Sequence, residues 1–526
     1  MISTTAAFAF SWVCGLVLYK LFTTGRRKKT YPPGPPTVSI LGNAHIFPKK
    51  RAHIRLTEWS RMYGDIYSLM IGNGVVAVIS SYAAVKELLD KQSSITGDRP
   101  NFHIGDVVTG GVHLAQMQSN DPNWSLMRKA ARSMMTVPKC NEHLPIQRAE
   151  AIQFMHEILE NPALYPKHAE RYTYSVISSV VYGIRAPNLK GQEITDFYHF
   201  LDLWNRYNEP GRHPPVDLIP ILKYVPMRWA LWKREAKVVR NLRQAHYYSL
   251  LDRVQKRVDR GASFGAFMEQ IVQDYESTGM DRELMASLGG GLLEGGSDTT
   301  SSYLKTLRLA LVAFPEAQHK AHEEMDRVVG PDRLPELQDI ENLPYIRAII
   351  KEVQRWRPPA PLSLPHATSQ DAHYGGYVVP RGATIFLNMW AIAHDDNLYE
   401  NPEKFWPDRY IKAEFGTRDG VDVSAFRHTL GFGGGKRICP GINLANNSIQ
   451  INTMNLIWAF DFLKMIDSAT KRPIDVDVNN YTEALLISPN PFPCDMKVRS
   501  PQHAELINQA LQESASTFQQ FEDILP

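Results

Sequence analysis

Residues 431–441 place the strongest constraint on how this chain can fold, because five of these eleven residues are glycine. Glycine costs about 1 kcal/mol relative to alanine in the interior of a helix, and it also weakens a central strand. The segment reads GFGGGKRICPG and is therefore expected to be a tight backbone loop. A helix is expected to follow it from about Ile442.

Two phosphate-binding patterns fail in this loop. The P-loop pattern needs Ser or Thr directly after Gly-Lys, and Arg437 stands there instead. The dinucleotide pattern G-x-G-x-x-G needs a third glycine, which neither Gly431 nor Gly433 has at the required offset. Two readings remain. Either the glycines let backbone N–H groups point at Cys439 as a thiolate ligand, or Cys439 is a free cysteine in a structural turn.

The loop resembles the haem-binding signature F-x-x-G-x-R-x-C-x-G of the cytochrome P450 family. The matching residues are Phe432, Gly435, Arg437, Cys439 and Gly441. The resemblance implies a mainly α fold with small β-sheets and haem b as the cofactor. It also implies that Cys439 is the axial ligand of the haem iron, and that Phe432 and Arg437 bind the cofactor, with Arg437 as the cation for the propionates. Thiolate ligation pushes electron density onto the iron and favours O–O cleavage.

Three further motifs support the resemblance. The first is Glu352-x-x-Arg355, on a stretch that reads as helix over residues 346–355, so that the two side chains share a face. Taken alone, this is an exposed ion pair worth about 0.3–0.5 kcal/mol. The resemblance instead places it inside the protein near the thiolate side of the haem, together with Arg409. A buried charge costs several kcal/mol unless it is paired, so the expected role of the three residues is structural.

The second motif is Asp298-Thr299, which follows five glycines between residues 289 and 296. So many glycines predict a helix that is locally weakened, or no helix at all. The resemblance implies a long helix across the distal face of the haem, opened at Gly295-Gly296 to admit O2. It makes Thr299 and Asp298 the catalytic pair, in which Thr299 orients a water and Asp298 relays protons. The alternative is that one of the two is the N-cap of a helix.

The third motif is Trp124-x-x-x-Arg128. Two residues at this spacing share one helix face. The resemblance implies that both side chains reach the haem propionates, and that His366 is a further propionate partner. The alternative for His366 is an ordinary solvent-facing histidine.

The remaining pattern is mostly helical. Residues 65–80 are expected to form a β-hairpin, because apolar runs flank Asn73-Gly74, a two-residue turn signal. A second strand-like stretch covers residues 377–388. Apolar residues at helical spacing predict helices elsewhere, most clearly over residues 148–159, 171–182, 234–258 and 315–329.

The N-terminus has a different composition from the rest. The first charged side chain is Lys20, and a basic cluster follows at residues 26–29. A spanning helix needs about 20 apolar residues, and the basic cluster favours a cytoplasmic C-terminal side. A cleaved signal peptide is the alternative, but a signal peptide carries its positive charge before the apolar run, whereas here the charge follows it.

The expected location is the endoplasmic reticulum membrane, with a single pass and a cytoplasmic catalytic domain. The expected division is an N-terminal transmembrane helix over 1–24, a basic and proline-rich hinge over 25–36 and a haem-thiolate catalytic domain over 37–526.

Charge and cysteine content exclude several other classes. The net charge is only +3 and no basic stripe is interleaved with aromatic residues, so no nucleic-acid partner is expected. None of the four cysteines lies in a C-x-x-C pair, which argues against zinc-ribbon and thioredoxin-type sites. Four scattered cysteines do not form a disulfide framework, so a reducing compartment is expected.

The resemblance implies a monooxygenase that converts R–H, O2, two electrons and two protons into R–OH and water. The 85 residues after Gly441 are too few for flavin domains. NADPH and flavins are therefore expected to act only through a separate NADPH–cytochrome P450 reductase, docked near Lys436.

The alternatives to a monooxygenase are a haem-thiolate isomerase or dehydratase and a non-catalytic haem sensor. Neither has much use for the pair Asp298 and Thr299.

The resemblance also narrows the substrate class. Residues 53–59, 294–299 and 355–358 look like those of fungal microsomal enzymes of secondary metabolism, especially hydroxylases of small phenolic polyketides such as m-cresol. The segments expected to contact the substrate are mostly apolar, which suits a small hydrophobic molecule. Terpenoid, alkaloid and larger polyketide substrates stay open. Those segments are residues 102–114, the neighbourhood of Leu292, and residues 362–364 and 484–486.

Overall fold

The structure is a computed structural model that describes residues 12, 15, 19–20, 23–208, 212–214, 216–217 and 220–522. The transmembrane helix predicted over residues 1–24 lies largely outside this set. Among the residues described, no helix is both long and apolar enough to cross a membrane. The described chain is mainly helical with small sheets, as the sequence predicts.

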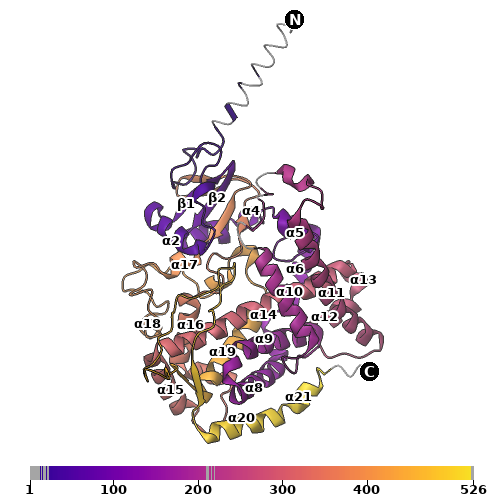
Figure 1. The fold of residues 1–526 in the computed structure, drawn as a ribbon, viewed down its shortest axis with the longest axis vertical. Coiled ribbons are helices and arrows are strands. Elements are labelled where there is room, and N and C mark those ends of the chain that lie inside the picture. Colours follow the sequence, from indigo (N-terminus) through magenta and orange to yellow (C-terminus); the bar gives the residue numbers. More distant parts are fainter. Residues whose placement is uncertain are drawn as a thin grey trace.

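The largest sheet joins parts of the chain that are far apart in sequence. The hairpin predicted near residue 70 is confirmed, and its second strand pairs in parallel with a strand that follows residue 383. The stretch predicted over 377–388 is split between two sheets. Figure 1 shows the hairpin in the upper part of the molecule. The strands, in sheet order, are β1 (Ile66–Ile71), β2 (Gly74–Ile79), β6 (Thr384–Leu387) and β3 (His366–Ala367); then β4 (Ala372–Tyr374) with β5 (Tyr377–Val379); and β7 (Phe460–Leu463) with β8 (Asp495–Val498).

The hairpin turn lies one residue earlier than predicted. Ile71 pairs with Gly74, so the two central residues are Gly72 and Asn73 rather than Asn73 and Gly74. Gly72 has a φ of +57°, and a positive φ at the first central position is what a type II′ turn requires. The Asn-Gly signal therefore located the hairpin but assigned the turn to the wrong glycine.

Helices supply the rest of the body, and the four that the sequence predicts most clearly are confirmed within a few residues. They correspond to α8, α9, α11 and α15. The helices used below are α5 (His103–Thr109), α6 (Pro122–Met134), α8 (Leu144–Glu160), α9 (Tyr165–Tyr182), α10 (Gln192–Tyr207), α11 (Leu231–Asp259), α14 (Arg282–Ala313), α15 (Pro315–Val328), α16 (Pro344–Trp356), α19 (Ile442–Ala459), α20 (Pro501–Glu513) and α21 (Ala515–Gln519).

The central helix α14 connects two apolar cores. Figure 1 shows it in the middle of the molecule, with α9 and α19 beside it. Its first half, with Leu288 and Leu293, packs into a core that α9 and α11 share. Its second half, with Leu304 and Leu311, packs into a core that contains buried residues of α16 and α19. The predicted catalytic residues therefore lie where α14 passes from one core to the other.

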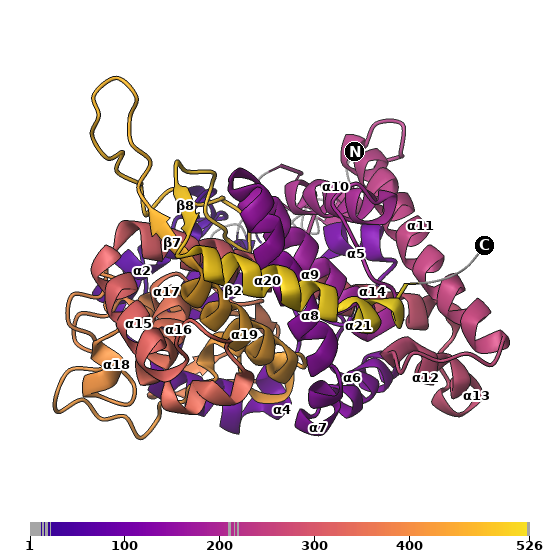
Figure 2. The same cartoon turned by 90° about the horizontal axis from the view of Figure 1, so that it is seen from below.

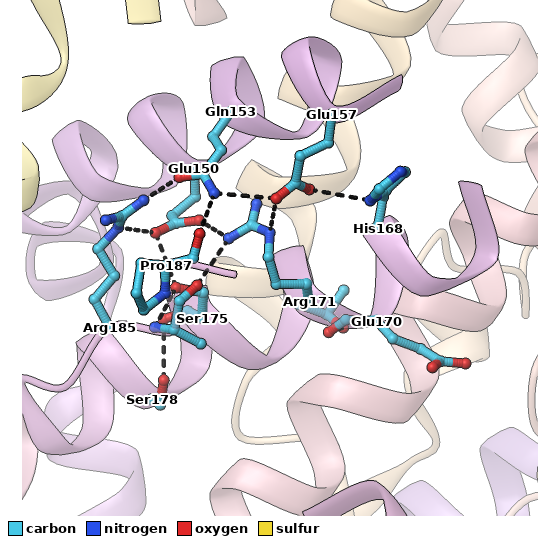
Figure 3. Close-up of polar contacts among 12 residues, drawn as sticks. Glu150, Gln153, Glu157, His168, Glu170, Arg171, Ser175, Ser178, Arg185 and Pro187 are labelled. Carbon is cyan, nitrogen blue, oxygen red and sulfur yellow. Dashed lines mark hydrogen bonds and ion pairs between the residues drawn. The ribbon is translucent and has the colours of Figure 1, made fainter. Parts of the chain in front are cut away.

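A buried ionic network fastens α8 to α9 (Figure 3). Glu150 and Arg171 are both fully buried, and Arg171 Nη1 donates to Glu150 Oε2 at 2.5 Å. Arg185 Nε donates to Glu150 Oε1 at 2.7 Å, and the Ser175 hydroxyl donates to the same oxygen at 2.8 Å. Because a buried carboxylate is stable only when paired and hydrogen-bonded, these contacts fix the spacing of the two helices.

The C-terminal helices α20 and α21 lie across α8 like a strap (Figure 2). The end of α21 and the residues that follow it cover Arg185, a member of the buried network. Its guanidinium lies over the Phe518 ring at 3.6 Å, its backbone N–H donates to Phe521 O at 3.1 Å, and its Nη1 donates to Glu522 at 2.8 Å. Phe518 and Phe521 also belong to the first apolar core. The strap is therefore part of the folded body.

Replacing Phe518 with alanine is expected to destabilise the protein by about 3 kcal/mol, because it removes a buried ring and uncovers Arg185. The midpoint of urea unfolding measures this loss. Tyr275→Ala is the matched control, since that ring is 52% exposed and should cost about 0.5 kcal/mol or less. Equal midpoints for the two variants would show that the strap does not contribute to stability.

Candidate active site

The glycine-rich segment folds as predicted, into a tight loop that leads into α19. Two short 3₁₀ turns, Leu430–Phe432 and Gly435–Arg437, precede Cys439. The Cys439 N–H donates to Phe432 O at 2.9 Å and closes the loop. Gly435 has a φ of +55°, and a Cβ there would lie 2.1 Å from Leu89 O. Only glycine fits at that position.

Asp90 and Arg427 hold this loop from outside. Arg427 Nη1 lies 2.7 Å from both carboxylate oxygens of Asp90, and its Nη2 donates to Gly433 O at 2.9 Å. Asp90 Oδ1 also accepts the Gly435 N–H at 3.0 Å. Sequence reasoning missed both side chains. Asp90 lies more than three hundred positions from the loop, and Arg427, although it lies just before the loop, belongs to no recognised motif.

Trp124 and Arg128 lie on one face of α6, as their spacing predicts, and both are buried. Arg437 stacks on Trp124, with its guanidinium carbon 4.0 Å from the ring centroid. Arg128 Nη2 donates to Ile438 O, directly before Cys439. The structure therefore brings three of the predicted cofactor-binding residues to the cysteine loop.

Arg99 joins these cations although the sequence did not identify it. It is 7% exposed, and burial, then the charges of Arg437 and Arg128, lower its pKa to about 9. The nearby carboxylate of Asp98 opposes this shift, but Asp98 Oδ1 already accepts the N–H groups of Arg99 and Ser119 at 3.0 and 2.7 Å. The group thus has an excess of buried positive charge. We call Arg99, Arg128 and Arg437 the cation cluster.

His366 lies beside the cation cluster on β3. It is 3% exposed, so the solvent-facing alternative is wrong. Its Nδ1 lies 3.2 Å from Thr96 O. Burial, followed by the charge of Arg99, holds the pKa of His366 well below its usual range. His366 is therefore neutral and available as a hydrogen-bonding group.

Helix α14 is continuous through its glycines, so the alternative that this stretch is not a helix is wrong, and the long helix that the resemblance implies is confirmed. Its N-cap is Asp281, whose side chain accepts the Leu284 N–H at 2.8 Å. The N-cap alternative for Asp298 and Thr299 is also wrong, because both lie in the middle of the helix. The Thr299 hydroxyl donates to Gly295 O, one turn earlier, at 2.8 Å.

The glycines of α14 serve two different faces. At three of them a Cβ would lie closer than 3.0 Å to a neighbouring side chain, so these glycines allow tight packing. At Gly291 and Gly295 a Cβ would have no atom within 4 Å among the described residues. Gly291, Gly295 and Thr299 follow one another at i, i+4 spacing and so share this open face. The packed glycines and their neighbours are Gly289 against Tyr182, Gly290 against Tyr247, and Gly296 against Ile177.

Asp298 points away from Thr299, since adjacent helix positions do not face each other. Burial raises the pKa of its carboxyl; Lys305 opposes this shift and Glu170 adds to it. Lys305 donates to Glu170 at 2.8 Å, and the exposed Lys167 donates to the other Glu170 oxygen at 2.9 Å. Asp298 therefore sits beside a charged group that reaches solvent.

Glu352, Arg355 and Arg409 meet in one buried network, so the exposed-pair alternative is wrong. Arg355 donates to both Glu352 oxygens at 2.8 Å, and Arg409 Nε donates to Oε1 at 3.2 Å. The Trp406 N–H adds a fourth hydrogen bond at 2.8 Å. Exposure is 0% for Glu352, 6% for Arg355 and 2% for Arg409.

The donor set fits a thiolate-ligated, anionic cofactor. Burial raises the pKa of the Cys439 thiol, while the Gly441 N–H and the charge of Arg128 favour the thiolate. Arg128 Nε is buried and has no hydrogen-bond partner in the part of the chain that the structure describes. A buried cation beside a cysteine loop, with no carboxylate partner among the described residues, suits a group that brings negative charge, as haem does with its two propionates.

Comparison with known proteins also supports a haem-binding chain. The family model for Cytochrome P450 matches residues 32–491. A cytochrome P450 monooxygenase of Armillaria gallica is 41% identical, over 98% of each chain. The cytochrome P450 monooxygenase patI of Penicillium expansum is 36% identical, over 99% of this chain and 97% of its own, and yanC of Aspergillus niger is 37% identical, over 94% and 95%.

Proposed function

Since the chain belongs to the cytochrome P450 family and is a haem-dependent monooxygenase, we propose that it inserts one oxygen atom into a small hydrophobic molecule of fungal-type secondary metabolism. The observation that carries this proposal is the cation cluster packed against the Cys439 loop. The resemblance to phenolic polyketide hydroxylases supports a small aromatic substrate. The fungal source of the relatives supports the metabolic setting.

Each side chain has a proposed part in holding the cofactor. Cys439 would ligate the iron, and the cation cluster with Trp124 and His366 would bind the propionates. Phe432, whose carbonyl closes the loop on Cys439, would help to hold the cofactor beside this loop. When bound, a haem with a thiolate ligand supplies dioxygen activation and O–O cleavage.

The chain's own contribution to the reaction is proton delivery. The Thr299 hydroxyl donates to Gly295 O, and rotation of Thr299 about χ1 would release that hydroxyl to the open face of α14. Asp298 has a raised pKa, so it can hold a proton closer to neutral pH than an exposed carboxyl can. Lys305 and Glu170 connect its surroundings to solvent through Lys167.

Replacing Thr299 with alanine is expected to lower the product formed per NADPH consumed by roughly tenfold, because the hydroxyl that positions the proton is lost. NADPH oxidation should continue. The measurement is the ratio of product to NADPH with an accepted substrate. Thr299→Ser, which keeps the hydroxyl, is the control. A serine variant as uncoupled as the alanine variant would show that the methyl group matters and the hydroxyl does not.

We propose that a separate NADPH–cytochrome P450 reductase docks where Lys436 meets α6. Arg132 is exposed, and its Nη2 donates to Lys436 O at 3.2 Å. Lys129 is also exposed and shares a face of α6 with Arg132. These cations form a positive surface directly outside the Cys439 loop, which suits an acidic partner.

We propose that the protein is held at the endoplasmic reticulum membrane by residues 1–24, with the hinge over 25–36 and the catalytic domain on the cytoplasmic side. Exposed apolar side chains near the hinge support this arrangement. A second group lies on a short 3₁₀ turn, Pro220–Tyr224, and on the segment from there to the first residue of α11. They are Val38, Ile40 and Leu41, and then Ile221, Tyr224, Trp229 and Leu231.

The test uses the full chain in microsomes with a microsomal reductase and NADPH. We expect haem reduction, detected as the carbon monoxide complex, and consumption of NADPH and O2 when a substrate is present. A spectral-shift screen with phenols and terpenoids identifies that substrate. Product without O2 consumption would indicate an isomerase or dehydratase, and a protein that binds haem but is never reduced would contradict the proposal.

A further inference from the structure

The segment between α5 and α6, residues 110–117, is held at its two ends by different groups. At one end the cation cluster binds its carbonyls. Arg99 Nε donates to Ala115 O at 2.8 Å, and Arg437 Nη2 donates to Met117 O at 2.6 Å. This end is therefore fixed by the same side chains that are proposed to hold the haem propionates.

At the other end the segment is fastened to α14 and α11 through one carboxylate, Glu294. Its Oε2 lies 3.1 Å from His113 Nε2, and its Oε1 accepts the Tyr247 hydroxyl. Arg243 Nε lies 3.8 Å from Oε1, and Arg243 Nη2 donates to Val112 O at 3.3 Å. Side chains of the segment and of α11 thus meet at Glu294 of α14.

The contact of His113 Nδ1 shows which group donates in the hydrogen bond between His113 Nε2 and Glu294. The Ala115 N–H donates to His113 Nδ1 at 3.2 Å, so Nδ1 is an acceptor. The proton of the neutral ring therefore sits on Nε2 and is donated to the Glu294 carboxylate. This arrangement sets the ring orientation of His113 and the position of the segment together.

The side chains around Glu294 are largely buried and closely packed. The side chains of His113 and Glu294 are each 10% exposed, and that of Arg243 is 4% exposed. Gly290 makes room for Tyr247, because a Cβ there would lie 2.2 Å from the phenol ring. Residues 110–114 of the fastened segment are among those expected to contact the substrate. The fastening therefore borders the proposed substrate space.

We propose that Glu294 is a positioning residue, whose carboxylate clasps residues 110–117 to α11 and α14 and so limits opening of the distal space. The end held by Arg99 and Arg437 stays in place when the clasp opens. Loss of the Glu294 carboxylate takes from the buried Arg243 cation the stronger of two carboxylate charges, the other being that of Glu283. Arg243 can regain solvation only if the segment moves away. This inference rests on the proposed function, since the distal space is that of the haem.

The experiment compares holoenzyme variants Glu294→Gln and Tyr247→Phe with wild type. Tyr247→Phe removes a single hydroxyl, so it tests the clasp even if Glu294→Gln folds poorly. Hydrogen–deuterium exchange at residues 110–117 should be severalfold faster in both variants, because these amides report local opening. Carbon monoxide recombination after flash photolysis should also be severalfold faster, while the haem content stays that of wild type.

Tyr248→Phe is the matched control. Tyr248 is the next residue on α11, and its ring lies under the Arg282 guanidinium instead of facing Glu294. It should leave exchange and recombination unchanged. Exchange at residues 110–117 that is the same in all four proteins would overturn the clasp. A wild-type protein that forms no carbon monoxide complex would instead contradict the proposed function, and the exchange comparison would still decide the clasp.

Discussion

The Cys439→Ala variant is expected to lose the absorption band at about 450 nm that the reduced carbon monoxide complex of a haem thiolate shows. Alanine has no sulfur, and the described residues offer no second cysteine in the loop. The loop should still fold, because the hydrogen bond that closes it comes from the backbone N–H of residue 439. Monooxygenase activity should fall below detection.

The matched control for this variant is Cys494→Ser. Cys494 is a part-buried free cysteine directly before β8, and its thiol donates to the Asp495 carbonyl, far in sequence from the glycine loop. Its replacement should leave the band and its intensity unchanged. A Cys439→Ala protein that keeps the band would remove the basis for thiolate ligation by this loop.

The Glu352→Ala variant is expected to be destabilised by about 3–5 kcal/mol, because it leaves two buried guanidinium groups without their carboxylate. Burial lowers the pKa of Arg355, and Glu352 more than offsets this, so the pKa is raised. Burial lowers the pKa of Arg409 as well, and the charge of Glu352 offsets only part of this lowering. Both arginines thus depend on the same carboxylate for stable charge. The measurement is the urea midpoint together with the fraction of protein that retains haem.

Glu142→Ala is the control for this effect. Glu142 and Lys139 form an ion pair with the same i,i+3 spacing at 3.0 Å, but their side chains are 59% and 43% exposed. Such a pair contributes about 1 kcal/mol or less. If the two alanine variants unfold at the same urea concentration, burial of the Glu352 network does not contribute to stability.

The sequence predicted those parts of the site that depend on local spacing. The loop around Cys439 is encoded by its glycines, and Trp124 and Arg128 share a face because four positions separate them on one helix. The meeting of Glu352 with Arg409 was reached only through the family resemblance, since no local spacing connects residues 57 positions apart.

The sequence did not predict contacts that depend on distant packing. Arg99 and Asp90 carry no motif, and only the folded chain brings them to the cysteine loop. For a related reason, the glycines of α14 left open from spacing alone whether this stretch is a helix. At Gly289, Gly290 and Gly296 the helix cost of about 1 kcal/mol each is offset by close packing against side chains such as Tyr182, which the local sequence does not reveal.

The parallel pairing of β2 with β6 has a consequence for how the chain folds during synthesis. Val76 pairs with Thr384, so the hairpin is made about three hundred residues before the strand that covers its edge. At roughly 5–20 residues per second, that interval lasts on the order of 15–60 s. A lone hairpin is only marginally stable, and an uncovered strand edge invites pairing with other chains. Nascent chains should therefore depend on chaperones until β6 has left the ribosome, and fragments that end before it should aggregate.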